Sequence, residues 1–160
     1  MTGTAIMSPD GVYRYSLTRQ LSSRPGRLKH CTWIMLNPST ATAEIDDPTI
    51  RRCIGFATSW ECHALTVVNL FALRATDPTE LAAHADPVGP ENDGYIITAA
   101  NLGGIVVAAW GVHGILHGRD RVVRDLMKRY GHELRCLGTT QGGFPRHPLY
   151  VKGDTQLVLL

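Results

Sequence analysis

A short segment near the end of the chain combines a titratable side chain with a stiffened backbone. Arg146 and His147 lie between Pro145 and Pro148, and a proline on each side restricts the directions that the two side chains can take. An imidazole can donate, accept or transfer a proton near neutral pH, and a guanidinium binds carboxylates and phosphates. The segment therefore has the residues of a binding or acid-base site, although a surface turn that contains a histidine by chance has the same composition.

Three apolar runs upstream also end in polar or aromatic side chains. Residues 31–36, 65–70 and 105–110 are apolar runs of the kind that form strands buried on both faces of a parallel sheet. In such a sheet, ligands bind in the crevice at the carboxyl ends of the strands. With the His147 segment, four strand ends carry candidate site residues: Asn37, Ser39 and Thr40; Asn69 and Arg74; Trp110 and His113; Arg146 and His147.

The segments between these runs predict the elements that position the site. Asp47 suits a helix N-cap and Pro48 a first helical residue. Helices are expected at about 48–60, from 77 onward, at 90–101 and at 119–130, strands at 12–18, 31–36, 65–70, 105–110 and 134–137, and a turn at 22–26. The alternation predicts a three-layer α/β/α sandwich with a mainly parallel four-stranded central sheet, plus an N-terminal edge strand or hairpin.

The composition is that of one globular domain spanning residues 1–160. The chain is 44% apolar and has no apolar stretch long enough to cross a bilayer, and residues 1–10 lack a secretory signal. We therefore expect a cytoplasmic protein with no membrane contact. A net charge of +2 is too small to argue for nucleic acid by itself, although the basic residues are rich in arginine. The four cysteines, which we expect to be reduced core residues, are Cys31, Cys53, Cys62 and Cys136.

Several common enzyme classes are excluded or disfavoured by missing motifs. No Gly-x-Gly-x-x-Gly turn follows the first buried strand, and neither a P-loop nor a Gly-x-Ser-x-Gly elbow occurs. His113 and His117 have the i, i+4 spacing of metal ligands on a helix, but glycines at 111, 114 and 118 disfavour a regular helix there. We expect neither a metal nor another cofactor.

Four segments resemble a bacterial and phage family described as a domain of unknown function. They are Met35 to Ala41, Asp46 to Cys53, Val68 to Pro78 and Pro145 to Tyr150, and the resemblance extends from residue 12 to about residue 157. The order and placement of the loops are also similar, more distantly, to the uracil-DNA glycosylase superfamily. This sequence departs from that superfamily at Ser39, where a glycine is usual, and in the final motif, which keeps His-Pro but lacks the serine and the second proline.

The second resemblance implies a monofunctional DNA glycosylase. Such an enzyme hydrolyses the N-glycosidic bond of a damaged or modified pyrimidine flipped out of DNA, in repair or in defence against phages with modified DNA. The catalytic residues implied are His147 at the leaving base, Asn37 at the attacking water, and Asp46 or Asp47, for which helix capping is the alternative. The base-binding residues implied are Asn69, with Phe71 or Trp110 stacking on the base unless they are core residues. The residues implied in DNA or phosphate binding are Ser39, Thr40, Arg74, His113 and Arg146.

Two other functions fit the same residues. One is a hydrolase or transferase acting on free nucleosides or nucleotides, and the other is a non-catalytic protein that binds a nucleotide or modified DNA. The non-catalytic function is kept as an alternative because the amide of Asn37 is not a strong general base. A DNA enzyme should show a steep salt dependence and an extended basic groove, whereas a nucleotide enzyme should show neither. The expected partner is DNA, bound by a monomer.

Overall fold

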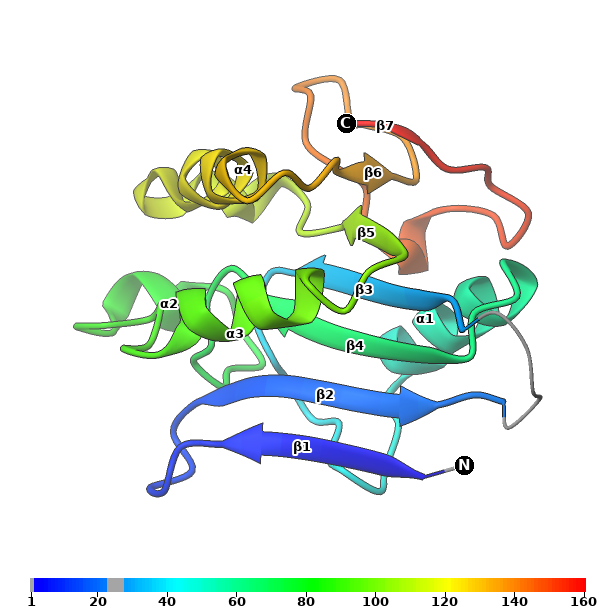
Figure 1. Ribbon diagram of the computed structural model, residues 1–160. Helices are drawn as coiled ribbons and strands as arrows, with labels where there is room; N and C mark the ends of the chain where they lie inside the picture. The colour runs from blue at the N-terminus through cyan, green and yellow to red at the C-terminus, as the bar shows by residue number, and fades with distance from the viewer. Residues whose placement is uncertain (1, 23–27) are drawn as a thin grey trace.

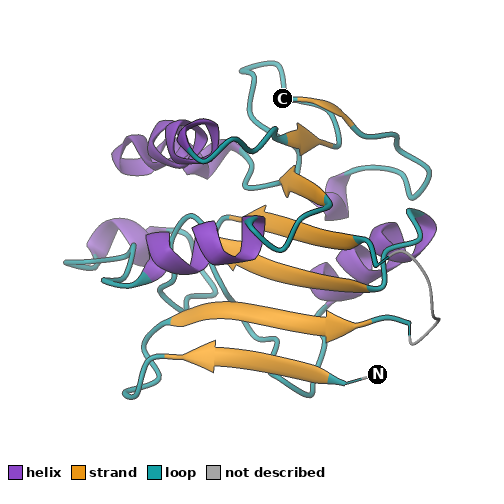
Figure 2. Ribbon diagram, in the orientation of Figure 1, coloured by secondary structure: helices purple, strands orange, loops and turns teal. Residues whose placement is uncertain are grey.

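The computed structural model describes residues 2–22 and 28–160, and within them the chain is an α/β protein with a seven-stranded mixed sheet and four α-helices (Figures 1 and 2). The strands are β1 (Gly3–Met7), β2 (Arg14–Gln20), β3 (His30–Met35), β4 (Ala64–Asn69), β5 (Ile105–Ala108), β6 (Arg135–Cys136) and β7 (Val158–Leu159). The helices are α1 (Pro48–Ser59), α2 (Thr79–Ala83), α3 (Asn92–Ala100) and α4 (Arg119–Arg129), with 3-10 helices η1 (Val112–Gly118) and η2 (Pro148–Tyr150).

The four expected parallel strands form the centre of the sheet. The strand order is β1-β2-β4-β3-β5-β6-β7, in which β4, β3, β5 and β6 are mutually parallel. The expected N-terminal hairpin is confirmed, because β1 and β2 pair antiparallel and β2 continues antiparallel onto β4. The expected sheet of four central strands with an N-terminal strand or hairpin is too small, because the sheet has seven strands in the described residues. The antiparallel strands β1, β2 and β7 extend the two edges of the sheet, and β1 and β7 lack the buried apolar pattern that marks the central strands.

Helices cover both faces of the sheet (Figures 1 and 2). Alternate residues of a strand point to opposite faces, so Trp33 packs with α1 on one face while Ile34 packs with α3 and α4 on the other. Asp47 caps α1, as expected, and Pro48 is its first residue. The turn expected at 22–26 lies, apart from Ser22, outside the described residues. No helix in the described ranges is long and apolar enough to cross a membrane.

A β-bulge in the N-terminal hairpin changes the direction of one arginine. Ile6 pairs with Ser16 and the next residue, Met7, pairs with Arg14, so β2 carries one extra residue at this point. Tyr15 stacks on Tyr95 of α3, with ring centroids 4.9 Å apart. Arg14 instead reaches the loop that leads into α1, where its Nη1 donates to the carbonyl oxygen of Ala41 at 2.6 Å.

Candidate functional site

A crevice of about 530 Å³ lies at the carboxyl ends of β3, β4 and β5. This is the edge of the sheet where a ligand site was expected, and the volume lies in the range of small-molecule sites. The structure brings together eight of the twelve expected site residues here: Asn37, Ser39, Asp47, Asn69, Trp110, His113, Arg146 and His147. A second hollow of about 660 Å³, between α4 and residues 142–145, shares Trp110 but is lined by none of the other eleven.

Asn37 is held so that its side-chain oxygen is left as an acceptor. Its Nδ2 donates to the carbonyl oxygens of Pro38 at 3.1 Å and Ala75 at 2.8 Å, so both amide hydrogens are used. Ala75 N in turn donates to Pro38 O, which ties the loops after β3 and β4 together. The amide of Asn37 therefore has a fixed orientation at the crevice wall, with an oxygen that can accept a hydrogen bond from water.

Asn69 and Trp110, which line the crevice, each carry a buried hydrogen-bond donor without a partner among the described residues. Asn69 is the last residue of β4, its side chain is 1% exposed, and within the described part of the chain its Nδ2 has no acceptor. The same is true of the indole Nε1 of buried Trp110. A buried donor without a partner costs about 1–3 kcal/mol. Two such groups in one crevice indicate a site for a ligand that carries acceptors.

Gly114 allows the chain after β5 to pass close to Trp110. A Cβ built on Gly114 would overlap Cδ1 and approach Nε1 of the Trp110 indole. The backbone of η1 therefore packs directly against the indole ring. This contact fixes the wall of the crevice from which Trp110 faces the ligand space.

His147 adopts one defined tautomer when it is neutral. Its Nδ1 accepts a hydrogen bond from Leu149 N at 3.2 Å, so the proton of the neutral ring is on Nε2. Burial lowers the pKa of His147 below its usual value, an effect that the carboxylate of Asp47 partly opposes. The ring of Tyr150 lies 5.4 Å away, centroid to centroid. His147 thus presents a neutral N–H donor at the crevice.

Arg52 of α1 holds the turn that carries His147. Its Nε donates to Pro148 O at 3.1 Å, its Nη2 bonds to Val151 O, and its guanidinium lies over the ring of Phe56. The buried Pro145 binds the segment on its other side, because its carbonyl oxygen accepts from Gly111 N at 2.9 Å. The turn that carries His147 is therefore attached to both α1 and the end of β5.

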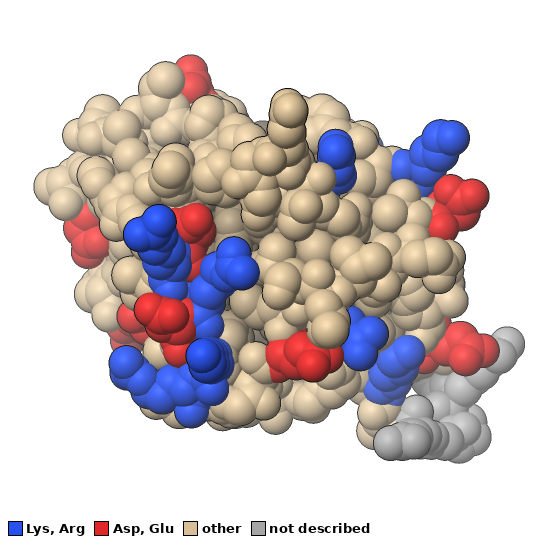
Figure 3. All heavy atoms as spheres, turned by 90° about the horizontal axis from the view of Figure 1, so that it is seen from above, with Lys and Arg blue, Asp and Glu red and all other residues tan. Residues whose placement is uncertain are grey.

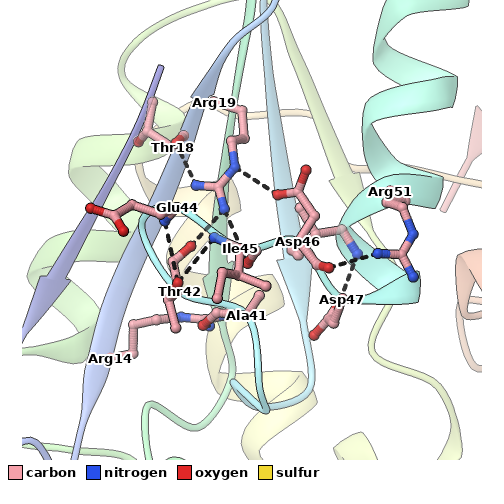
Figure 4. A network of polar contacts seen from close by, with 11 residues as sticks. Arg14, Thr18, Arg19, Ala41, Thr42, Glu44, Ile45, Asp46, Asp47 and Arg51 are labelled. Atoms are coloured by element: carbon pink, nitrogen blue, oxygen red, sulfur yellow. Dashed lines mark hydrogen bonds and ion pairs between the residues drawn. The ribbon is translucent and has the colours of Figure 1, made fainter. Parts of the chain in front are cut away.

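The carboxylates of Asp46 and Asp47, in the loop before α1, differ in their position relative to the crevice. Asp46 Oδ1 accepts from Arg19 Nε at 2.8 Å, and Asp46 does not line the crevice (Figure 4). Asp47 lines the crevice and also caps α1 through a hydrogen bond from Ile50 N to Oδ1 at 2.8 Å. The carboxylate available to a ligand is thus Asp47, and Asp46 belongs to an ion pair that supports the loop.

Three further expected site residues lie outside the crevice. Phe71 is fully buried in the core on the α3 face, so it cannot stack on a ligand there. Arg74 is exposed and donates from Nη1 to Gly11 O at 3.3 Å. Thr40 is exposed on the loop after β3 and does not line the crevice. For Thr40 and Arg74 the neighbouring residues Ser39 and Ala75 do line the crevice, so only the individual side chains lie outside it.

The His113 and His117 pair does not form on a regular helix. Both residues lie in η1, and the backbone of that 3-10 helix is non-helical at Leu116 and His117. No group of three or more metal-binding side chains occurs among residues 2–22 and 28–160.

Arg14, Leu149 and Tyr150 also line the crevice, and none of them was an expected site residue. Arg14 is 3% exposed, whereas Tyr150 is 80% exposed at the rim. The one available signal for Arg14 was a charged residue between two tyrosines in a strand of β-forming residues. The signal for Leu149 and Tyr150 was their place directly after His147-Pro148.

The chain belongs to the family described as "Protein of unknown function (DUF1643)", whose model matches residues 14–149. This confirms membership of a family of unknown function, as expected from the four motifs. Comparison with curated proteins finds no match. Comparison with solved structures finds none either. The likeness to the uracil-DNA glycosylase superfamily therefore stays a prediction.

Proposed function

We propose that this protein is a monofunctional DNA glycosylase that hydrolyses the N-glycosidic bond of a damaged or modified pyrimidine. The observation that carries the proposal is the meeting of Asn37, Asn69, Trp110 and His147 with the carboxylate of Asp47 in one crevice. Helices on both faces of a sheet with four central parallel strands are consistent with the three-layer arrangement of the uracil-DNA glycosylase superfamily.

The residues of the crevice match the needs of the reaction. Breaking the bond between the sugar C1′ and the base nitrogen leaves the electron pair on the base and positive charge on the sugar. Water adds to C1′, and its proton neutralises the released base. Catalysis of this kind needs stabilisation of both charges and one positioned water. Asn37 Oδ1 accepts from the water, Asp47 faces the cationic sugar, and His147 Nε2–H donates to the leaving base.

The inner wall would recognise the base. Asn69 Nδ2 donates to an acceptor on the pyrimidine edge, and the indole of Trp110 lies against the base or donates to it. Unpaired buried donors favour a ligand that supplies the matching acceptors, and an analogue without them is strongly rejected. Leu149 and Tyr150, which are exposed at the rim, would contact the bases next to the flipped nucleotide, and Arg146 and His113 would face phosphates.

The charge distribution favours a second candidate, an enzyme that acts on free nucleosides or nucleotides. The face of the molecule in Figure 3 shows basic side chains interspersed with acidic ones, and the net charge is only +2. A DNA enzyme gains affinity from many phosphate contacts, which makes its binding steeply dependent on salt. Salt dependence of activity therefore separates the two candidates.

The test is an assay for abasic sites. Purified protein is incubated with labelled duplex and single-stranded DNA that carries uracil or hydroxymethylated or glucosylated pyrimidines, beside Asn69→Ala, Asn37→Ala and His147→Ala. Alkali-sensitive nicks that disappear in the variants are the expected result. If all of these DNAs and ordinary phage DNA stay intact while free nucleosides are cleaved, the second candidate replaces the first.

A further inference from the structure

Two arginines of β2 are equally buried but differ in their partners. Arg14 and Arg19 are each 3% exposed. Arg19 pairs with Asp46 and also donates to carbonyl oxygens of Thr18 and Thr42 (Figure 4). Arg14 donates to Ala41 O, but its Nε has no acceptor and its guanidinium no ion pair within the described ranges of the chain. A buried cation without an anion is energetically unfavourable, so Arg14 lacks a partner that Arg19 has.

The missing partner belongs in the crevice. Arg14 lines it together with Asn69 and Trp110, and each of these residues has a buried side-chain nitrogen without a partner in residues 2–22 and 28–160. All three atoms are N–H donors. The matching ligand group therefore carries acceptors, and next to a guanidinium it carries negative charge.

The position of Arg14 depends on the β-bulge at Tyr15. Without the extra residue, the alternation of β2 would place Arg14 on the face opposite Leu17, away from α1. Burial lowers the pKa of Arg14 to about 10 and the charge of Asp47 opposes this effect, so the guanidinium stays charged at neutral pH. Asp47 lines the same crevice, but its Oδ1 is bonded to Ile50 N rather than to Arg14. The crevice thus contains the positive charge of Arg14 and the negative charge of Asp47, and no hydrogen bond joins the two groups.

We propose that Arg14 is a catalytic residue that binds the negatively charged edge of the leaving base, together with Asn69. This inference rests on the proposed function. When the C1′–N bond breaks, its electron pair goes to the base, and neutral His147 supplies a hydrogen bond but no charge. Arg14 supplies the positive charge opposite the base, while Asp47 stands opposite the cationic sugar. The charge separation of the crevice then matches that of the transition state.

The first experiment compares stability. Thermal unfolding is measured for the wild type, Arg14→Met and Arg19→Met without ligand. Because Arg14→Met removes a buried charge that forms no ion pair, we expect an unfolding temperature equal to or above that of the wild type. Arg19→Met leaves Asp46 without its partner, and we expect a lower unfolding temperature. A loss of stability in Arg14→Met as large as that in Arg19→Met would mean that Arg14 serves the fold, and would overturn the proposal.

The second experiment measures binding of an anionic base. The probes are 5-nitrouracil, whose ring N–H is acidic enough to ionise at neutral pH, and uracil, which stays neutral. Calorimetric titration of the wild type should show a preference for the anion of at least about tenfold, as for a desolvated ion pair. Arg14→Gln keeps an amide donor but has no charge, and it should lose that preference. The proposal is wrong if the wild type has no preference for the anion, or if Arg14→Gln keeps it.

The two proposals can fail separately. If the charge-dependent binding is found but no DNA or nucleoside is cleaved, Arg14 is an anion-binding residue and the glycosylase proposal fails. If cleavage occurs and Arg14→Gln cleaves at the wild-type rate, the glycosylase stands and the role of Arg14 fails. A drop of at least about 100-fold in kcat, the size seen when one electrostatic donor is removed from an active site, supports both.

Discussion

Asp47 and Ile50 form the hydrogen bond that begins α1, with 2.8 Å between Asp47 Oδ1 and Ile50 N. Asparagine caps helices about as well as aspartate, so Asp47→Asn removes the negative charge but keeps the helix cap. We expect Asp47→Asn to change the free energy of unfolding by less than about 1 kcal/mol and to lower kcat by at least about 100-fold. Urea denaturation and single-turnover cleavage measure the two effects.

Asp46→Asn is the matched control for that prediction. It weakens the ion pair with Arg19, which lies outside the crevice, so stability should fall by about 1 kcal/mol while kcat stays near the wild-type value. Equal losses of kcat in the two variants would contradict the separate roles of the neighbouring carboxylates.

His147 should act as a neutral donor over the whole neutral pH range. Its pKa is lowered by burial, so its protonated form appears only below the usual pKa of histidine. The kcat/KM of the wild type should therefore stay constant as the pH falls to about 6.5 and decline only below it. A decline in kcat/KM that begins above this pH would contradict the assignment of neutral His147 as the donor.

His147→Asn tests the same residue without removing its turn. The Oδ1 of asparagine can accept from Leu149 N as the histidine Nδ1 does, whereas the donor corresponding to Nε2–H is lost. We expect unchanged thermal unfolding and a kcat lower by about 100-fold or more. His147→Ala should lose both the turn and the activity. Retention of activity in His147→Asn would contradict the assigned role.

Gly114→Ala should disturb the crevice through Trp110. The new Cβ would overlap the indole ring, and overpacking of this kind costs about 1–3 kcal/mol. We expect lower stability and weaker substrate binding. Gly55→Ala is the control, since nothing lies within 4 Å of its added Cβ and the substitution in α1 should stabilise by about 0.5–1 kcal/mol. Urea denaturation compares them.

His30 should make the protein sensitive to acid. Its side chain is 7% exposed, with Nε2 at 3.1 Å from Thr66 Oγ1, and burial lowers its pKa to about 4, with a smaller effect of neighbouring His63. Between the usual pKa of 6.5 and about 4, the unfolded chain binds a proton that the folded chain does not. As the pH is lowered across this window, the free energy of unfolding should therefore decrease, by up to about 1.4 kcal/mol per pH unit. His30→Gln should show a shallower slope in urea denaturation, and an unchanged slope would contradict the assignment.

Most of the crevice was predictable from the ends of the strands. Asn69 ends β4, and Asn37, Trp110 and His147 lie in loops that follow parallel strands. Parallel strands end at one edge of a sheet, and the structure places all four residues there. The start of α1 was also predictable, because capping by Asp47 depends only on local sequence.

The positions of other residues depend on loop paths and strand pairings that the sequence pattern does not predict. Whether Asp46 or Asp47 faces the crevice is decided by the path of one loop and by its ion pair with Arg19. Phe71 follows Asn69 by two residues, but the chain leaves the sheet between them and Phe71 turns into the core. Arg14 required the bulge at Tyr15, and β7 required pairing with a distant two-residue strand.

The crevice combines the first hairpin with the last loop of the chain, from Arg14 to Tyr150. During synthesis, the ribosome would release the strands that carry Asn37, Asn69 and Trp110 before the segment that holds His147. A nascent chain that ends before that segment can pair β1 with β2 and β3 with β4, yet it has no donor for the leaving group. The crevice therefore stays incomplete until the segment that holds His147 has left the ribosome.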